Sequence, residues 1–150
     1  MVGNNANPVI DLSQDTPSRA PGWGASLMAD KGSLLLMLYD KAIRCMEEAI
    51  ELIEVGDMIG KGERLIKAQD IVLQLADSLD KDSGVEGATD IALNLERLYL
   101  YIYTRLIKGN NYLDQDAIRE ARHLMNNLYR AWEQIILGTS ATSAPVPIRA

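Results

Sequence analysis

The chain of 150 residues has no phenylalanine, one cysteine, one histidine and no long apolar run. A single cysteine, Cys45, excludes a disulfide within the chain and a metal site built from cysteines, and it fits a reducing compartment. The longest apolar run, residues 34–39, is far too short to span a bilayer. Residues 1–12 lack the basic start and the apolar stretch of a secretion signal. We therefore expect a cytoplasmic protein without membrane insertion.

Positive charge is also scarce, since the formal net charge is -6 and the sequence pI is about 4.7. Such a balance repels a polyphosphate backbone and an anionic lipid surface unless a local basic patch overrides it. The basic residues between 41 and 67 alternate with glutamates three or four positions away, which is typical of solvated helix faces. Nucleic acid is therefore excluded as a partner.

The side chains that catalysis needs are nearly missing. Glu120 and His123 have the Glu-x-x-His spacing of di-iron bundles, but that site needs the motif twice and the chain has one histidine. A bundle oxidase would therefore need ligands from elsewhere. Residues 80–91 lack the final glutamate of a calcium loop, residues 56–62 lack the Ser or Thr of a phosphate loop, and no nucleophile motif occurs. We expect no enzyme activity, no metal and no cofactor.

Four stretches with apolar residues at helical spacing dominate the remaining sequence. The pattern predicts helices over about 33–55, 61–79, 89–108 and 116–137. The linkers after the first and third stretches are short, which makes consecutive helices antiparallel neighbours. We therefore predict an all-α fold, an antiparallel up-down four-helix bundle formed by residues 31–138.

Both ends of the chain are poor in helical pattern. Residues 1–30 contain Pro8, Pro17 and Pro21 among small polar residues, which predicts an irregular N-terminal arm that is flexible or docked on the body. Trp23 is the side chain that favours docking, because a large aromatic residue rarely stays in water. Residues 139–150 are rich in Ser, Thr and Pro and are predicted to be a disordered tail.

The third predicted helix has more apolar side chains than a bundle core requires. Over residues 91–107 they span roughly 220° of the helix circumference, whereas a core-facing stripe needs little more than about 100°. Ile66 and Leu73 likewise lie away from the main face of the second helix. An exposed apolar groove between helices two and three follows, to be covered by a second copy, a client segment or the arm. The alternative is that tyrosines 99, 101 and 103 are core and boundary residues.

Four segments carry a resemblance to a known family. They are LLLMLYDKAIR (34–44), KAQDIVLQLADSLD (67–80), IALNLERLYLYIYTRL (91–106) and LYRAWEQI (128–135). In order and rough spacing they resemble the flagellin chaperone family FliS. The resemblance implies a small helical bundle that binds the C-terminal segment of flagellin in an apolar groove, prevents its premature polymerisation and aids its secretion without ATP. The export apparatus or a second regulator is a further partner in this interpretation.

These inferences combine into one functional hypothesis and one alternative. The hypothesis is a flagellar export chaperone that is a monomer or a weak dimer. The alternative is a helical homodimeric interaction or adaptor protein without a secretion client. The residues expected to line the groove are Ile66, Leu73, Leu75, Asn94, Tyr99, Leu100, Tyr103 and Ile107.

Overall fold

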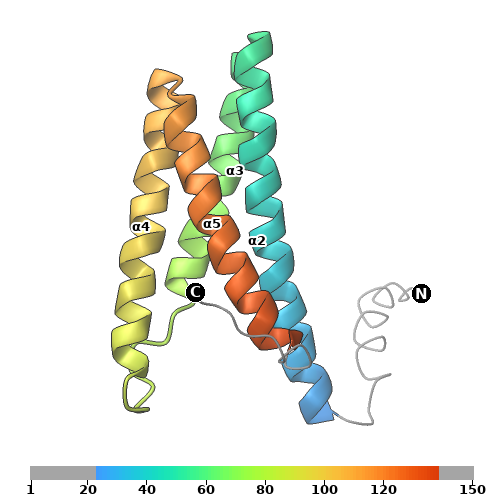
Figure 1. Ribbon diagram of the computed structural model, residues 1–150, viewed down its shortest axis with the longest axis vertical. Helices are drawn as coiled ribbons and strands as arrows, with labels where there is room; N and C mark the ends of the chain where they lie inside the picture. Colours follow the sequence, from blue (N-terminus) through green and yellow to red (C-terminus); the bar gives the residue numbers. More distant parts are fainter. Residues whose placement is uncertain (1–22, 139–150) are drawn as a thin grey trace, which may run out of the picture. The chain divides into compact units, whose positions relative to one another are not determined.

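The computed structural model describes residues 23–138, in which four helices form an up-down bundle (Figure 1). The helices are α2 (Trp23–Val55), α3 (Met58–Asp77), α4 (Ala88–Tyr112) and α5 (Gln115–Ile136). α2 and α4 run in one direction, and α3 and α5 run in the other (Figure 1). The predicted all-α class and up-down topology are confirmed. None of the helices within residues 23–138 has the length and apolarity needed to cross a membrane.

The chain divides into two compact units, residues 1–34 and residues 35–150. The packing described below belongs to the second unit. Residues 1–22 and 139–150 lie outside the described residues. They comprise most of the predicted arm (1–30) and all of the predicted tail (139–150).

Short polar turns start and stop the helices. The Asp57 side chain accepts a hydrogen bond from the backbone N–H of Gly60 (2.8 Å), and the Asp114 side chain accepts one from that of Ala117 (3.1 Å). Each caps the first turn of its helix, α3 or α5, by satisfying an N–H that has no partner within the helix. Gly56 follows α2 with φ 81°, a left-handed conformation that favours glycine. The predicted stop at Gly56-Asp57 is confirmed.

The core fills the space between the four helices and includes a hydrogen-bonded aromatic cluster. The hydroxyls of Tyr39 on α2 and Tyr99 on α4 bond to each other, and Trp132 Nε1 on α5 donates to the Tyr39 hydroxyl (3.1 Å). Three helices are thereby held in register by polar groups that would cost free energy if unpaired. The largest fully buried side chains are Tyr39, Tyr99, Met46, Leu65, Ile102, Leu106, Ile118, Met125 and Val72.

The first helix is longer than its sequence pattern indicates. α2 begins at Trp23, whereas the sequence pattern predicted a start at about residue 33. Gly24, Gly32 and Ser33 lower helix propensity and suggested a later start, but α2 contains no proline. Every residue of α2 therefore has a backbone N–H for a helical hydrogen bond, and weak propensity alone does not end a helix.

Gly109 lies inside α4 and does not begin a linker. α4 continues to Tyr112, four residues beyond the predicted end at Lys108. A Cβ at position 109 would lie only 2.3 Å from Ile118 Cγ1 of α5, so glycine permits the close approach of the two helices. Ile135 is 64% exposed near the end of α5, although it follows Leu128 and Trp132 at helical spacing.

Candidate functional site

α4 bears apolar side chains on more of its circumference than the core covers. Ala92, Tyr99, Ile102 and Leu106 form its buried face. Outside that face, Leu100 is 44% exposed. The partly or largely exposed apolar side chains of α4 also include Ile91, Leu93, Tyr101, Tyr103 and Ile107. The predicted surplus of apolar surface on this helix is therefore present.

Polar contacts show which neighbour each side of α4 meets. On one side, Glu120 of α5 accepts a hydrogen bond from the Tyr101 hydroxyl (2.7 Å) and pairs with Arg105 (2.8 Å). On the other side, Glu96 pairs with Lys81, which follows α3 (2.9 Å). At 100° per residue, Leu93, Leu100 and Ile107 share the side of Glu96. They form a stripe with a spacing of seven residues along the α3 side of α4.

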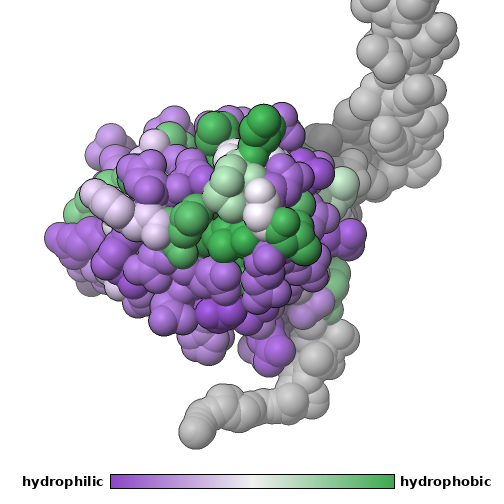
Figure 2. Space-filling view, turned by 90° about the horizontal axis from the view of Figure 1, so that it is seen from above, coloured by the Kyte–Doolittle hydropathy of each residue, from purple (hydrophilic) through white to green (hydrophobic). Residues whose placement is uncertain are grey.

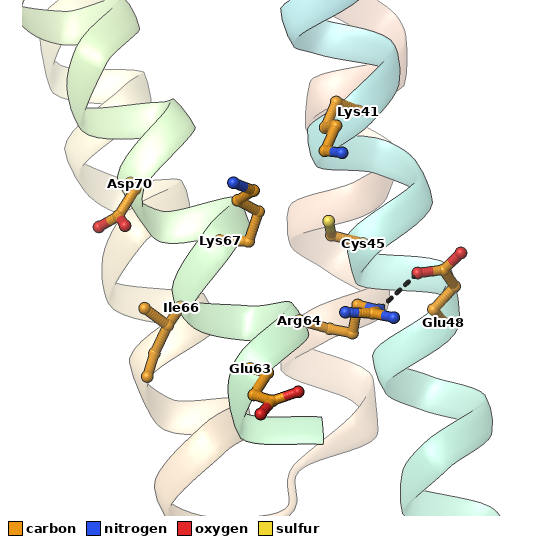
Figure 3. A pocket seen from close by; sticks show the side chains of 8 residues that line it. All are labelled: Lys41, Cys45, Glu48, Glu63, Arg64, Ile66, Lys67 and Asp70. Atoms are coloured by element: carbon orange, nitrogen blue, oxygen red, sulfur yellow. Dashed lines mark ion pairs between the residues drawn. The ribbon is translucent and has the colours of Figure 1, made fainter. Parts of the chain in front are cut away.

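α3 contributes a matching stripe. Its Arg64 pairs with Glu48 of α2 (2.8 Å), which identifies the side that faces α2. Ile66 and Leu73 lie roughly 160 to 180° around the helix from Arg64. Figure 3 shows Ile66 pointing away from α2. Ile66 and Leu73 therefore lie on a side of α3 that does not pair with α2, although Ile66 also borders a hollow between α2 and α3.

The two helices are held together at one end of this seam. Lys61 of α3 is only 8% exposed, and its Nζ donates to the backbone oxygen (3.0 Å) and the side-chain oxygen (2.7 Å) of Asn110 of α4. Because α3 and α4 are antiparallel, counting from this contact brings Ile66 opposite Ile107 and Leu73 opposite Leu100 to within about two residues. We name these side chains the α3–α4 apolar strip: Ile66, Leu73, Leu93, Leu100 and Ile107.

The structure brings together only some of the residues expected to line a groove. Four of them, Ile66, Leu73, Leu100 and Ile107, belong to the strip, and Tyr103 is half-buried between the strip and the core. Asn94 lies on the outward face of α4, where its side-chain oxygen accepts a hydrogen bond from Arg97 (3.0 Å).

Leu75 and Tyr99 must be removed from the expected groove. They are 3% and 2% exposed and belong to the core cluster, so they present no surface to a partner. Leu75 lies on the main buried face of α3, and the Tyr99 hydroxyl is turned inward to Tyr39. Leu93 was not among the residues expected to line the groove, but it lies seven residues before Leu100 on the same side of α4 and extends that row.

A hollow on the described surface lies at the α2–α3 seam instead, and most of the side chains that line it are charged. Its volume is about 540 Å³. Lys41 and Cys45 of α2 and Lys67 of α3 point into it, whereas Asp70 points away from α2 (Figure 3). Burial is the main cause that raises the pKa of the Cys45 thiol, which keeps it protonated and a poor nucleophile. The Cys45 thiol is therefore not activated for covalent chemistry.

The Glu-x-x-His motif is not arranged as a metal site. The carboxylate of Glu120 is already used by Tyr101 and Arg105. His123 is exposed, and its Nε2 lies 3.4 Å from Asn127 Nδ2 of the same helix. Within residues 23–138 no three His, Cys, Asp or Glu side chains are grouped so as to hold a metal ion. The arrangement of the described side chains favours binding through an apolar surface.

Comparison with known proteins agrees with this arrangement. The family model described as "Flagellar protein FliS" matches residues 24–139. A flagellar secretion chaperone FliS of Salmonella typhimurium is 38% identical over 112 residues, which are 74% of this chain and 80% of the relative. The Escherichia coli chaperone of the same name is 32% identical over 123 residues, covering 81% and 88%. That of Bacillus subtilis is 32% identical over 108 residues, covering 72% and 77%.

Proposed function

Because the chain belongs to the FliS family of flagellar secretion chaperones, which are not enzymes, we propose that it binds the C-terminal segment of flagellin on the α3–α4 apolar strip. Binding there in the cytoplasm keeps flagellin from polymerising early and holds it ready for secretion. The single observation that supports this proposal is the double stripe of apolar side chains outside the core, with Ile66 53% and Leu100 44% exposed.

The spacing of the strip suits a helical client. Residues seven apart on α3 and on α4 form two parallel rows, and an amphipathic helix presents its own apolar side chains at spacings of three, four and seven residues. A helix laid along the seam contacts both rows at once. The covering of Ile66 and Leu100 removes apolar surface from water and supplies the free energy of binding.

A single substitution with a matched control tests this site. Ile66→Ser removes one apolar contact from the strip, whereas Ile135→Ser makes the same change at a side chain of α5 that is 64% exposed and lies outside the strip. Burial of the exposed part of Ile66 contributes about 1.4 kcal/mol, which corresponds to about tenfold in affinity. We expect Ile66→Ser to weaken binding of a C-terminal flagellin peptide by about tenfold and Ile135→Ser to leave it unchanged.

Fluorescence anisotropy of the labelled peptide measures both affinities, and circular dichroism verifies that each variant keeps its helices. Equal affinities for Ile66→Ser and the unmodified chain would refute the placement on the strip. A second copy of the chain is the competing occupant. Sedimentation equilibrium of the chain alone detects such a dimer. A tight dimer that Ile66→Ser dissociates would show that a second copy, and not flagellin, covers the strip.

A further inference from the structure

A second group of exposed apolar side chains lies at one end of the bundle. Seen from above in Figure 2, hydrophobic side chains gather near the middle of this end and hydrophilic ones surround them. The end is formed by the α2–α3 turn and the α4–α5 turn (Figure 1). We define the end patch as Val55, Met58, Ile59 and Leu113, of which Val55 and Ile59 are 76% and 78% exposed. None of the four belongs to the core cluster.

The backbone beneath the end patch is fixed by side-chain hydrogen bonds. Asp57 caps α3 through the N–H of Gly60, and Asp114 caps α5 through the N–H of Ala117. The buried Lys61 joins the start of α3 to the end of α4 by donating to Asn110. A partner therefore meets a surface that is already ordered, and it loses little free energy in ordering these turns.

Leu113 adds an observation from the backbone. It has φ 55° and is the sole residue other than glycine with a positive φ in residues 23–138. A left-handed conformation costs a branched L side chain about 1 to 2 kcal/mol, and glycine would avoid this cost. The leucine side chain nevertheless stays 45% exposed. Leu113 is the left-handed C-cap of α4, and strain of this kind clusters at sites that contact a ligand or partner.

The charges around the patch indicate the chemistry of that partner. Residues 51–63 hold one lysine, the buried Lys61, and four carboxylates, which leaves this segment with net negative charge. Within the described part of the chain, Glu51 and Glu54 form no ion pair. On the α4–α5 side the charges are balanced, since Lys108 pairs with Asp114 (3.6 Å). The patch is thus apolar at its centre and acidic on its α2–α3 side.

From these observations we infer that the end patch binds a basic amphipathic segment of a second protein. Apolar side chains of that segment cover Val55, Ile59 and Leu113, while its lysines or arginines meet the carboxylates of Glu51 and Glu54. A second copy of this chain would bring the same carboxylates face to face, and anionic lipid or nucleic acid would be repelled. A basic protein segment is the occupant that complements both the apolar centre and the acidic side.

The end patch borders the α3–α4 apolar strip but differs from it. Ile59 lies seven residues before Ile66 on the same face of α3, so it continues one row of the strip. Val55 belongs to α2 and Leu113 to the α4–α5 turn, and neither lies on a row of the strip. Variants at Val55 and Leu113 therefore separate the two surfaces, and the inference does not depend on the proposed flagellin site.

Two synthetic helical peptides with the same leucine spacing test the inference on the full chain. One peptide carries lysines on its polar face and the other carries glutamates. We expect the lysine peptide to shift the amide NMR signals of residues 54–60 and 110–114, and to bind at least about tenfold more tightly than the glutamate peptide. Val55→Ser combined with Leu113→Gly should weaken it by about tenfold and leave flagellin-peptide affinity unchanged.

A charge-reversal variant tests the acidic side of the end patch separately from its apolar centre. Glu54→Lys, a surface change that leaves the apolar side chains intact, should also weaken the lysine peptide. The inference would be overturned if the two peptides bound equally well or if neither bound the unmodified chain. It would also be overturned if the NMR shifts were confined to the α3–α4 apolar strip, or if only Ile66→Ser abolished binding of the lysine peptide. A dimer that the Val55→Ser and Leu113→Gly variant dissociates would overturn it in favour of a second copy.

Discussion

Substitution of Gly109 by alanine separates two effects that oppose each other. Alanine is favoured over glycine in a helix interior by about 1 kcal/mol, because glycine loses more backbone entropy on folding. Against this, a Cβ at position 109 would lie 2.3 Å from Ile118 Cγ1, 2.9 Å from Ile118 Cδ1 and 3.2 Å from the backbone oxygen of Asp114. The first two distances are shorter than any ordinary carbon contact, so the Ile118 side chain or the two helices must shift.

The steric effect is the larger one. Overpacking of a core contact costs about 1 to 3 kcal/mol and more where the backbone must shift, which exceeds the gain in helix propensity. Backbone does contribute to this contact, through the oxygen of Asp114. We therefore expect Gly109→Ala to lower the free energy of unfolding by about 1 to 2 kcal/mol.

Gly62→Ala is the matched control. Gly62 also lies inside a helix, but the nearest atom to its Cβ is the Asn110 side-chain oxygen at 4.0 Å, an ordinary contact. This variant should raise the free energy of unfolding by about 0.5 to 1 kcal/mol. Urea unfolding followed by circular dichroism measures both variants, with equal m-values indicating that the unfolded states are comparable.

A double variant identifies the clashing atom. Ile118→Ala removes both Cγ1 and Cδ1, so Gly109→Ala should cost less in that background than in the unmodified chain. Stabilisation of the unmodified chain by Gly109→Ala, equal to that by Gly62→Ala, would refute the close approach of α4 and α5.

Two further predictions concern polar groups. Tyr39→Phe removes the hydroxyl that Tyr99 and Trp132 contact, and should lower the free energy of unfolding by about 1 to 3 kcal/mol. Burial raises the pKa of Tyr39 and Tyr99, so above about pH 10 these tyrosines ionise only in the unfolded state. The free energy of unfolding should therefore fall as pH rises above about 10, and it should fall less steeply in Tyr39→Phe. Equal pH slopes of the two proteins in urea unfolding would contradict this. Asp114→Ala should lower the free energy of unfolding through loss of the α5 cap. Because the hydrogen bond from Ala117 N–H lowers the Asp114 pKa, its contribution should vanish as pH falls through that lowered pKa, and a pH-independent difference in melting temperature would count against the cap.

Much of the fold is predictable because burial follows a periodic pattern. The residues spaced by three and four in α3, such as Leu65, Ala68 and Leu75, are buried as that spacing requires. The helix boundaries are less predictable, because intrinsic helix propensity is weak and contacts with other parts of the chain determine where a helix ends. α2 extends back through Gly24 and Gly32, and α4 continues through Gly109. In the last case the reason lies in Ile118, nine positions farther along the chain.

The candidate site was predictable only in part for a similar reason. The sequence pattern identified α4 as too apolar around its circumference, and Leu100 is exposed accordingly. It did not separate Tyr99 from Tyr103, since both are apolar in pattern and four residues apart. Their difference arises from Tyr39, sixty residues earlier in the chain, whose hydroxyl bonds to that of Tyr99 in the core.

The sequence by itself determined the helical class, the order of the helices, the scarcity of catalytic groups and the family resemblance. Each of these follows from local spacing or from composition, which need no knowledge of distant neighbours. Only the tertiary structure decided which apolar side chains face the core, which form the α3–α4 apolar strip and which gather at the end of the bundle. Those assignments depend on the rotation of each helix about its axis, and long-range contacts such as Lys61 with Asn110 and Tyr39 with Tyr99 set that rotation.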